Sequence, residues 1–177
     1  MLKHFHITAR QWKALLKWTI YGMLFLLTLM FQTVILAKHP PFGVKPNLVA
    51  PLLVCVCIRE GAERGGVFAL LTALIWCFSG ADYGNLSVAI LPVCAILSAV
   101  LCRAVLTARL IPTLLFCLLT GLIHESAIFA LKVLLAGVSP RCFVSVVLPA
   151  VGLSLPAVPL QYLLAKTIGK IGGGNDL

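Results

Sequence analysis

The sequence has few charged residues, and no segment outside its apolar runs is long enough to form a soluble domain. Only 11% of the 177 residues are charged, whereas 61% are hydrophobic. An average soluble domain is far less apolar than this. Because a soluble fold of this length could not bury so much apolar surface, the composition predicts an all-α protein that lies in a membrane.

The sequence also lacks the motifs of an enzyme or a metalloprotein. It has no phosphate-binding glycine loop ahead of a lysine, no cluster of metal ligands and no nucleophile–base motif. Seven cysteines are present without a CxxC pair, and all but Cys142 lie in apolar runs, where they behave as small apolar residues. We therefore expect no catalytic residues, no metal and no cofactor.

The apolar residues form six runs, which predict six transmembrane helices and a single membrane domain over residues 18–166. Twenty residues of helix span about 30 Å, the thickness of the hydrocarbon core. The runs cover residues 18–37, 46–58, 66–79, 86–102, 110–136 and 143–165. The first run exceeds the length of a signal-peptide core, so we expect it to stay uncleaved. The second and third are short, and a shallow re-entrant pair is the alternative for them.

The distribution of lysine and arginine predicts that both termini lie in the cytoplasm. With that orientation, ten of the 14 basic residues are on the inner side, because cytoplasmic loops carry the excess. The four on the outer side are Lys38, Lys45, Lys132 and Arg141. We expect residues 1–17 to form a basic juxtamembrane segment and residues 167–177 to form a flexible cytoplasmic tail. Scattered basic residues of this kind do not indicate nucleic-acid binding.

Three polar residues inside the predicted spans are candidates for a site. Gln32 is expected to hydrogen-bond a neighbouring helix. Glu125, next to His124 in the fifth run, is costly at membrane depth and should face the bundle interior or a cavity. Two interpretations remain open: a proton relay or polar substrate contact, and a hydrogen bond that only fixes helix packing.

Small residues at four-residue spacing form a smooth ridge on the predicted third helix. They are Gly61, Gly65, Ala69 and Ala73. Such a ridge lets another backbone approach closely, either within the chain or in a partner helix. The adjoining charged turn allows Arg59–Glu63 and Glu60–Arg64 pairs if the turn is helical.

The pattern over residues 19–105 resembles the bacterial rod shape-determining protein MreD family. Gln32, followed by Gly-Val-Lys-Pro-Asn at 43–47, is similar to the opening of that family, and the ridge with Phe-Ser-Gly at 78–80 and Gly84 resembles its glycine ladder. Ala69 and Ala73 stand where the family often has glycine. Trp76 stands where it often has aspartate, so no role of that acid carries over, and Asp82 is a poor substitute.

The resemblance implies a non-enzymatic, multi-pass subunit of the cell-elongation machinery in the bacterial inner membrane. Such a protein would associate with a bitopic MreC-like protein and, through it, with an MreB-like filament and a RodA-type polymerase paired with a class B transpeptidase. The partner-interface candidates are the four ridge residues, and a homo-oligomer is also possible.

The alternative function is that of a substrate-binding subunit of an energy-coupling-factor vitamin transporter, a six-helix protein of similar plan. That function requires a polar pocket open to the outside. The outer loops are short and mostly apolar, so we expect little material for such a pocket, although Asp82, Tyr83 and Asn85 could contribute.

Overall fold

The computed structural model describes residues 9–79, 84–105 and 109–171, and over these residues the chain is almost entirely helical, with no strand. The long helices are α1 (Ala9–Met30), α5 (Gly84–Val105) and α6 (Leu110–Ala136), and the shorter ones are α3 (Val49–Glu60), α4 (Ala62–Phe78), α7 (Phe143–Ser154) and α8 (Ala157–Ile171). A π-helical turn (Phe31–Ile35) joins α1 to the short α2 (Leu36–Lys38), and 3₁₀ turns occupy Pro41–Gly43 and Pro140–Cys142. Helix α1 starts within the predicted 1–17 segment, and α8 extends into the predicted tail.

Four helical segments in the described part of the chain are long and apolar enough to cross a bilayer. They are Gln11–Lys38, Asn85–Ala104, Leu110–Ala136 and Pro140–Ile171. Helices α3 and α4, with 12 and 17 residues, fall short of that length. The composition thus supports a helical membrane protein, and six full spans remain a prediction.

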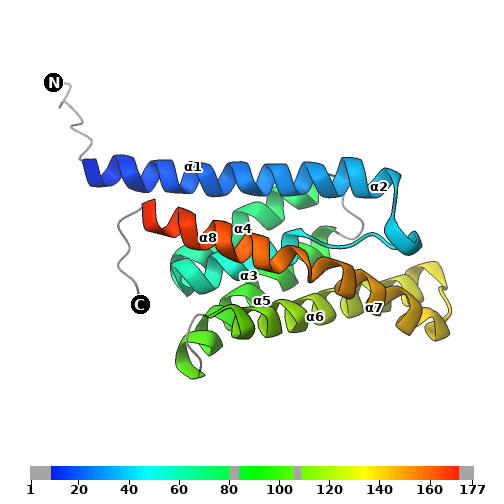
Figure 1. The fold of residues 1–177 in the computed structure, drawn as a ribbon. Coiled ribbons are helices and arrows are strands. Elements are labelled where there is room, and N and C mark those ends of the chain that lie inside the picture. The colour runs from blue at the N-terminus through cyan, green and yellow to red at the C-terminus, as the bar shows by residue number, and fades with distance from the viewer. Residues whose placement is uncertain (1–8, 80–83, 106–108, 172–177) are drawn as a thin grey trace.

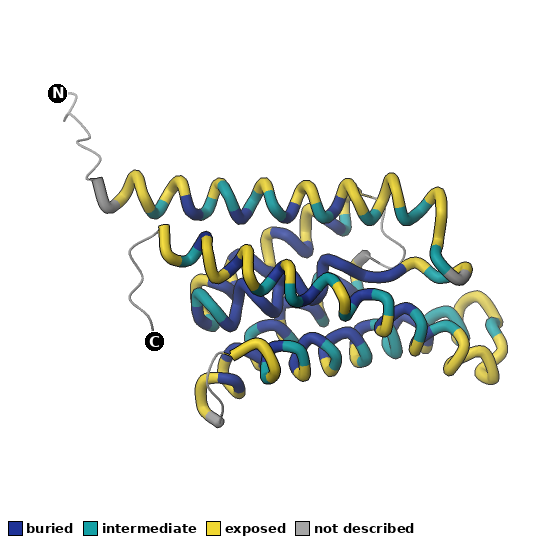
Figure 2. Tube along the Cα trace, in the orientation of Figure 1, coloured by how far each residue is buried: buried dark blue, intermediate teal, exposed yellow. Residues whose placement is uncertain are grey.

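Helix α3 forms the centre of the bundle. Its residues from Val49 to Ile58 are all buried, and it packs against α4, α5, α6 and α8, as the dark tube in Figure 2 shows. A helix that is surrounded by protein does not need to match the bilayer thickness, which explains why so apolar a helix is only 12 residues long. The exposed, apolar outer faces of α1, α4 and α6 lie around this core.

The first and last described residues lie at the same end of the molecule, because α1 and the α7–α8 segment run in opposite directions (Figure 1). At this end a buried ion pair joins α1 to α3: the Lys17 ammonium donates to Glu60, and both side chains are less than one-tenth exposed. The Tyr21 hydroxyl lies 3.0 Å from both Glu60 Oε1 and the Ala165 carbonyl oxygen, so it links α1 to α3 and α8.

The charged turn between α3 and α4 is not continuous helix. Gly61 has φ +99°, a conformation that favours glycine, and it ends α3 and precedes α4. The Arg59–Glu63 and Glu60–Arg64 pairs are predicted only for a helical turn, and the turn is not helical at Gly61. Glu60 pairs with Lys17. Arg103 donates to the Arg59 carbonyl at 3.3 Å. Its positive charge there also interacts favourably with the negative end of the α3 helix dipole.

The predicted ridge lies inside the chain. Gly61, Gly65, Ala69 and Ala73 are all buried. A Cβ atom at Gly65 would lie 2.5 Å from the Cα atom of Cys57, so α4 and α3 are in backbone contact there. The structure therefore uses this face for internal packing, and the use of the same face for docking a partner has no support in the fold.

Candidate functional site

The candidate site begins at the extended segment that precedes α3. Residues 44–48 are not helical, and from Pro46 onward they are buried, so their backbone groups need partners other than water. Gln32 Oε1 accepts from the backbone N–H of Leu48 at 2.8 Å and of Val49 at 3.3 Å. The prediction that Gln32 bonds a neighbouring helix is thus confirmed: it satisfies the first turn of α3.

Two further side-chain amides complete this arrangement. Asn47 Oδ1 accepts from the Ala50 N–H at 3.2 Å, and Gln161 Nε2 of α8 donates to the Leu48 carbonyl at 3.0 Å. Three amide side chains from three segments therefore hold one break in the helical backbone.

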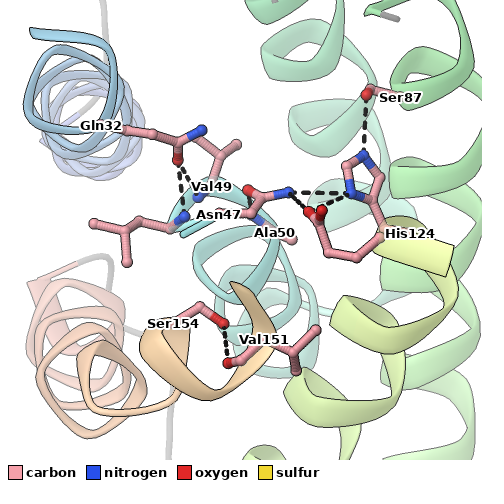
Figure 3. Close-up of polar contacts among 10 residues, drawn as sticks. Gln32, Asn47, Val49, Ala50, Ser87, His124, Val151 and Ser154 are labelled. Atoms are coloured by element: carbon pink, nitrogen blue, oxygen red, sulfur yellow. Dashed lines mark hydrogen bonds and ion pairs between the residues drawn. The ribbon is translucent and has the colours of Figure 1, made fainter. Parts of the chain in front are cut away.

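The other side of Asn47 faces His124 and Glu125 of α6. Its Nδ2 group lies 3.1 Å from His124 Nδ1 and 3.2 Å from Glu125 Oε1. Figure 3 shows the Asn47 side chain pointing toward His124. The same two α6 atoms are 3.2 Å apart, and His124 Nε2 lies 3.0 Å from Ser87 Oγ. The Asn47 amide carries two hydrogens and can donate one to each of these α6 atoms, and the role of Nδ1 toward Oε1 depends on the imidazole tautomer.

His124 is fully buried and stacks on Trp76 of α4, with ring centroids 5.8 Å apart and an interplanar angle of 25°. Its ring is thereby held by α4, α5, the segment before α3 and its own helix. Glu125 is less enclosed, with 18% of its side chain exposed. The expectation that Glu125 faces a cavity with His124 beside it agrees with this geometry.

Ser87, His124 and Glu125 contact one another in the same sequence as the serine, histidine and acid of a hydrolytic triad. Their positions along the chain do not indicate this arrangement. A nucleophile must reach its substrate, however. Ser87 is only 1% exposed and does not line the neighbouring cavity. We therefore assign the Ser87–His124 bond to the positioning of the imidazole ring.

A cavity of about 550 Å³ opens beside Glu125. It lies between the π-helical turn and α2, the segment before α3, and helices α4, α6 and α7. Its polar and charged lining includes Gln32, Lys45, Asn47, His124, Glu125 and Lys132. Gln32, His124 and Glu125 therefore belong to one site. The short loops are expected to supply little of such a pocket, and most of the walls of this cavity come from helices.

Several residues named from the sequence lie elsewhere. The four ridge residues are packed inside the bundle and do not line the cavity. Asn85 is exposed and accepts a hydrogen bond from the Cys77 thiol, whereas Asp82 and Tyr83 lie outside the described residues. Within the described ranges, no group of three or more histidine, cysteine, aspartate or glutamate side chains is placed to hold a metal ion.

Comparisons with known proteins identify no relative: no family model matches the chain, and neither a curated protein nor a solved structure matches it.

Proposed function

We propose that the chain is a non-enzymatic, MreD-like subunit of the bacterial cell-elongation machinery in the inner membrane. It would cross the membrane six times with both termini in the cytoplasm and dock a bitopic MreC-like partner. Through that partner it would act alongside an MreB-like filament and a RodA-type polymerase with its class B transpeptidase, and so help to control cell shape and peptidoglycan synthesis.

One contact carries this proposal. The resemblance to the MreD family depends on Gln32 and on the 43–47 segment, which are separated in the sequence. In the structure the Gln32 side chain accepts hydrogen bonds from Leu48 and Val49, directly after that segment. The two parts of the pattern therefore act as one unit, which is a physical reason for them to occur together.

The positions of basic residues support the proposed orientation. Lys17, Arg59 and Arg103 meet at the end where α1 begins and α8 finishes. Lys45 and Lys132 line the cavity, which also contacts the far end of the first helical segment at Ala37. If the richer basic end faces the cytoplasm, the cavity lies toward the outer surface.

The docking surface for the partner helix must be an exposed one, since the ridge is buried. The outward side of α4 is a candidate, because it exposes an unbroken apolar set to the membrane: Val67, Leu70, Leu71, Leu74, Ile75 and Phe78. The outer face of α1 is the other candidate, with Leu26 and Leu27 among its exposed residues.

Photo-cross-linking in cells tests the docking proposal. A photo-reactive residue replaces Leu71 on α4, Leu26 on α1 or, as a control, Leu119 on the exposed side of α6. We expect cross-links to the MreC-like protein from α4 or α1 and none from Leu119. No cross-link from either face, together with failure of the tagged chain to co-purify with that protein, would contradict the proposal.

A second candidate function is favoured by one observation, the cavity. A substrate-binding subunit of an energy-coupling-factor vitamin transporter needs a pocket of about 300–1,000 Å³ to enclose its ligand, and the cavity falls within that range. Co-purification separates the two functions: a transport ATPase module recovered with the chain supports the second. A vitamin operon around the gene, in place of an adjacent bitopic protein and actin-like gene, would do the same.

A further inference from the structure

The walls of the cavity beside Glu125 carry charged side chains of both signs. Glu125 stands on α6, and Lys132 follows it seven residues later on the same helix. That separation places them about 10 Å apart along the helix axis. Lys45 reaches the same cavity from the extended segment before α3.

The carboxyl group of Glu125 is held in place through one of its oxygens, and the other oxygen is free to accept a hydrogen bond. Asn47 Nδ2 and His124 Nδ1 both contact its Oε1 atom, and Oε2 has no hydrogen-bond partner among the described residues. A carboxylate oxygen at membrane depth is costly without a donor. The fixed geometry of Oε1 together with the open Oε2 makes Glu125 a preorganised acceptor for a cationic donor.

The two lysines supply the opposite charge. Lys45 is exposed and Lys132 is half-buried, and in the described part of the chain neither forms an ion pair. Two ammonium groups and one carboxylate line the cavity, so its walls carry an excess of positive charge. A ligand that carries only a cation would meet that excess, and one that carries only an anion would leave Glu125 without a donor.

We propose that this cavity binds a small zwitterion that carries a primary ammonium group and a phosphate or carboxylate group. The ammonium group donates to Glu125, and the anionic group lies between Lys45 and Lys132. A soluble metabolite and a phosphatidylethanolamine headgroup share this chemistry. The site goes beyond the docking of a partner helix and does not depend on it, because ligand binding is measured on the isolated protein.

Binding is tested with the purified full chain in phosphatidylcholine nanodiscs. Isothermal titration calorimetry uses O-phosphoethanolamine as the soluble zwitterion and ethyl phosphate as the matched anion without an ammonium group. In a parallel arm, part of the phosphatidylcholine is replaced by phosphatidylethanolamine, and the midpoint of thermal unfolding is followed. Saturable binding of O-phosphoethanolamine supports a soluble ligand, and stabilisation by phosphatidylethanolamine alone supports the headgroup.

The variants assign the binding to this cavity. Glu125→Gln should weaken binding of the zwitterion by about tenfold or more, the factor expected for the loss of one charge-assisted hydrogen bond, and it should not weaken binding of ethyl phosphate. Lys132→Met should weaken binding of both compounds. Lys38→Met is the control, since Lys38 is exposed and does not line the cavity.

Three results would overturn the proposal. The first is that neither zwitterion binds or stabilises the wild-type chain. The second is that ethyl phosphate binds as tightly as O-phosphoethanolamine. The third is that Lys38→Met reduces binding as much as Lys132→Met does. If Glu125→Gln does not fold, as shown by more than one species in size-exclusion chromatography, Lys132→Met and Lys38→Met still test the proposal. Weaker binding by Lys132→Met alone supports it, and equal binding by both variants contradicts it.

Discussion

Gln32 holds the start of α3 in place, because its side-chain oxygen accepts hydrogen bonds from two backbone N–H groups there. Gln32→Leu keeps the approximate size of the side chain but leaves those buried donors without a partner. We expect a loss of about 1–3 kcal/mol in the free energy of unfolding, the cost of an unsatisfied buried group. The measurement is thermal unfolding of the purified chain in detergent.

The control for that experiment is Thr19→Val on α1, the helix that leads into the π-helical turn of Gln32. The Thr19 hydroxyl donates only to the Leu15 carbonyl of its own helix, and the residue is exposed. Its loss should leave the unfolding midpoint nearly unchanged. An equal effect of both substitutions would show that Gln32 has no special role at the start of α3.

The sequence identifies some of the site residues and misses others, for reasons of distance and chemical type. Gln32, His124 and Glu125 are recognisable because a polar group inside an apolar run needs an explanation. Asn47 and Ser87 are small polar residues at the ends of runs, where they are common, and they contact His124 from 77 and 37 residues away. Only the fold brings them together.

At the scale of the elements, the contact between α3 and α4 gives the sharpest test. A Cβ atom at Gly65 would lie 2.5 Å from the Cα atom of Cys57, whereas one at Gly22 on α1 would meet nothing within 4 Å. Gly65→Ala should therefore force the helices apart and lower the folded yield, and Gly65→Leu should lower it further. Yield is measured as the monodisperse fraction in size-exclusion chromatography.

Gly22→Ala provides the matched comparison, because alanine has the higher helix propensity and the site is open. It should leave the yield unchanged or raise it. Should Gly65→Ala be tolerated as well as Gly22→Ala, the close approach of α3 and α4 would be wrong.

The buried ion pair between Lys17 and Glu60 also joins two helices, α1 and α3. Lys17→Met leaves the Glu60 carboxylate buried without its partner, and breaking such a pair costs about 3–5 kcal/mol. The double variant Lys17→Met with Glu60→Gln removes both charges and should recover part of that loss. Chemical denaturation of the two single variants and the double variant measures the coupling, and additive effects would argue against a buried pair.

The boundaries of the helices follow the hydropathy of the sequence closely in some places and not in others. The run at 110–136 coincides with α6, because it begins after a charged residue and ends at Gly137, which adopts the left-handed conformation. The run at 143–165 contains a break between α7 and α8, and the run at 46–58 starts before α3. Pro46 and Asn47 are not helical, and the backbone N–H and carbonyl of Leu48, which follows them, are satisfied by Gln32 and Gln161 from distant segments.

For the molecule as a whole, the exposed Cys142 is a natural reporter of orientation. It lies in the turn between α6 and α7, at the end proposed to face outward. A membrane-impermeant maleimide added to intact cells should label Cys142, and Cys142→Ser should remove that label. A cysteine at Lys170, in a background without the native thiols, should react only after permeabilisation. Labelling of the Lys170 position in intact cells would contradict the orientation.

Depletion of the chain in the organism that encodes it is the most direct test of the proposed function, with cell width and length measured by microscopy. The account predicts that depleted cells widen toward spheres, and that the wild-type chain restores the original shape whereas the Gly65→Leu variant does not. Cells that keep their shape after depletion, but then grow only when a vitamin is supplied, would contradict the account.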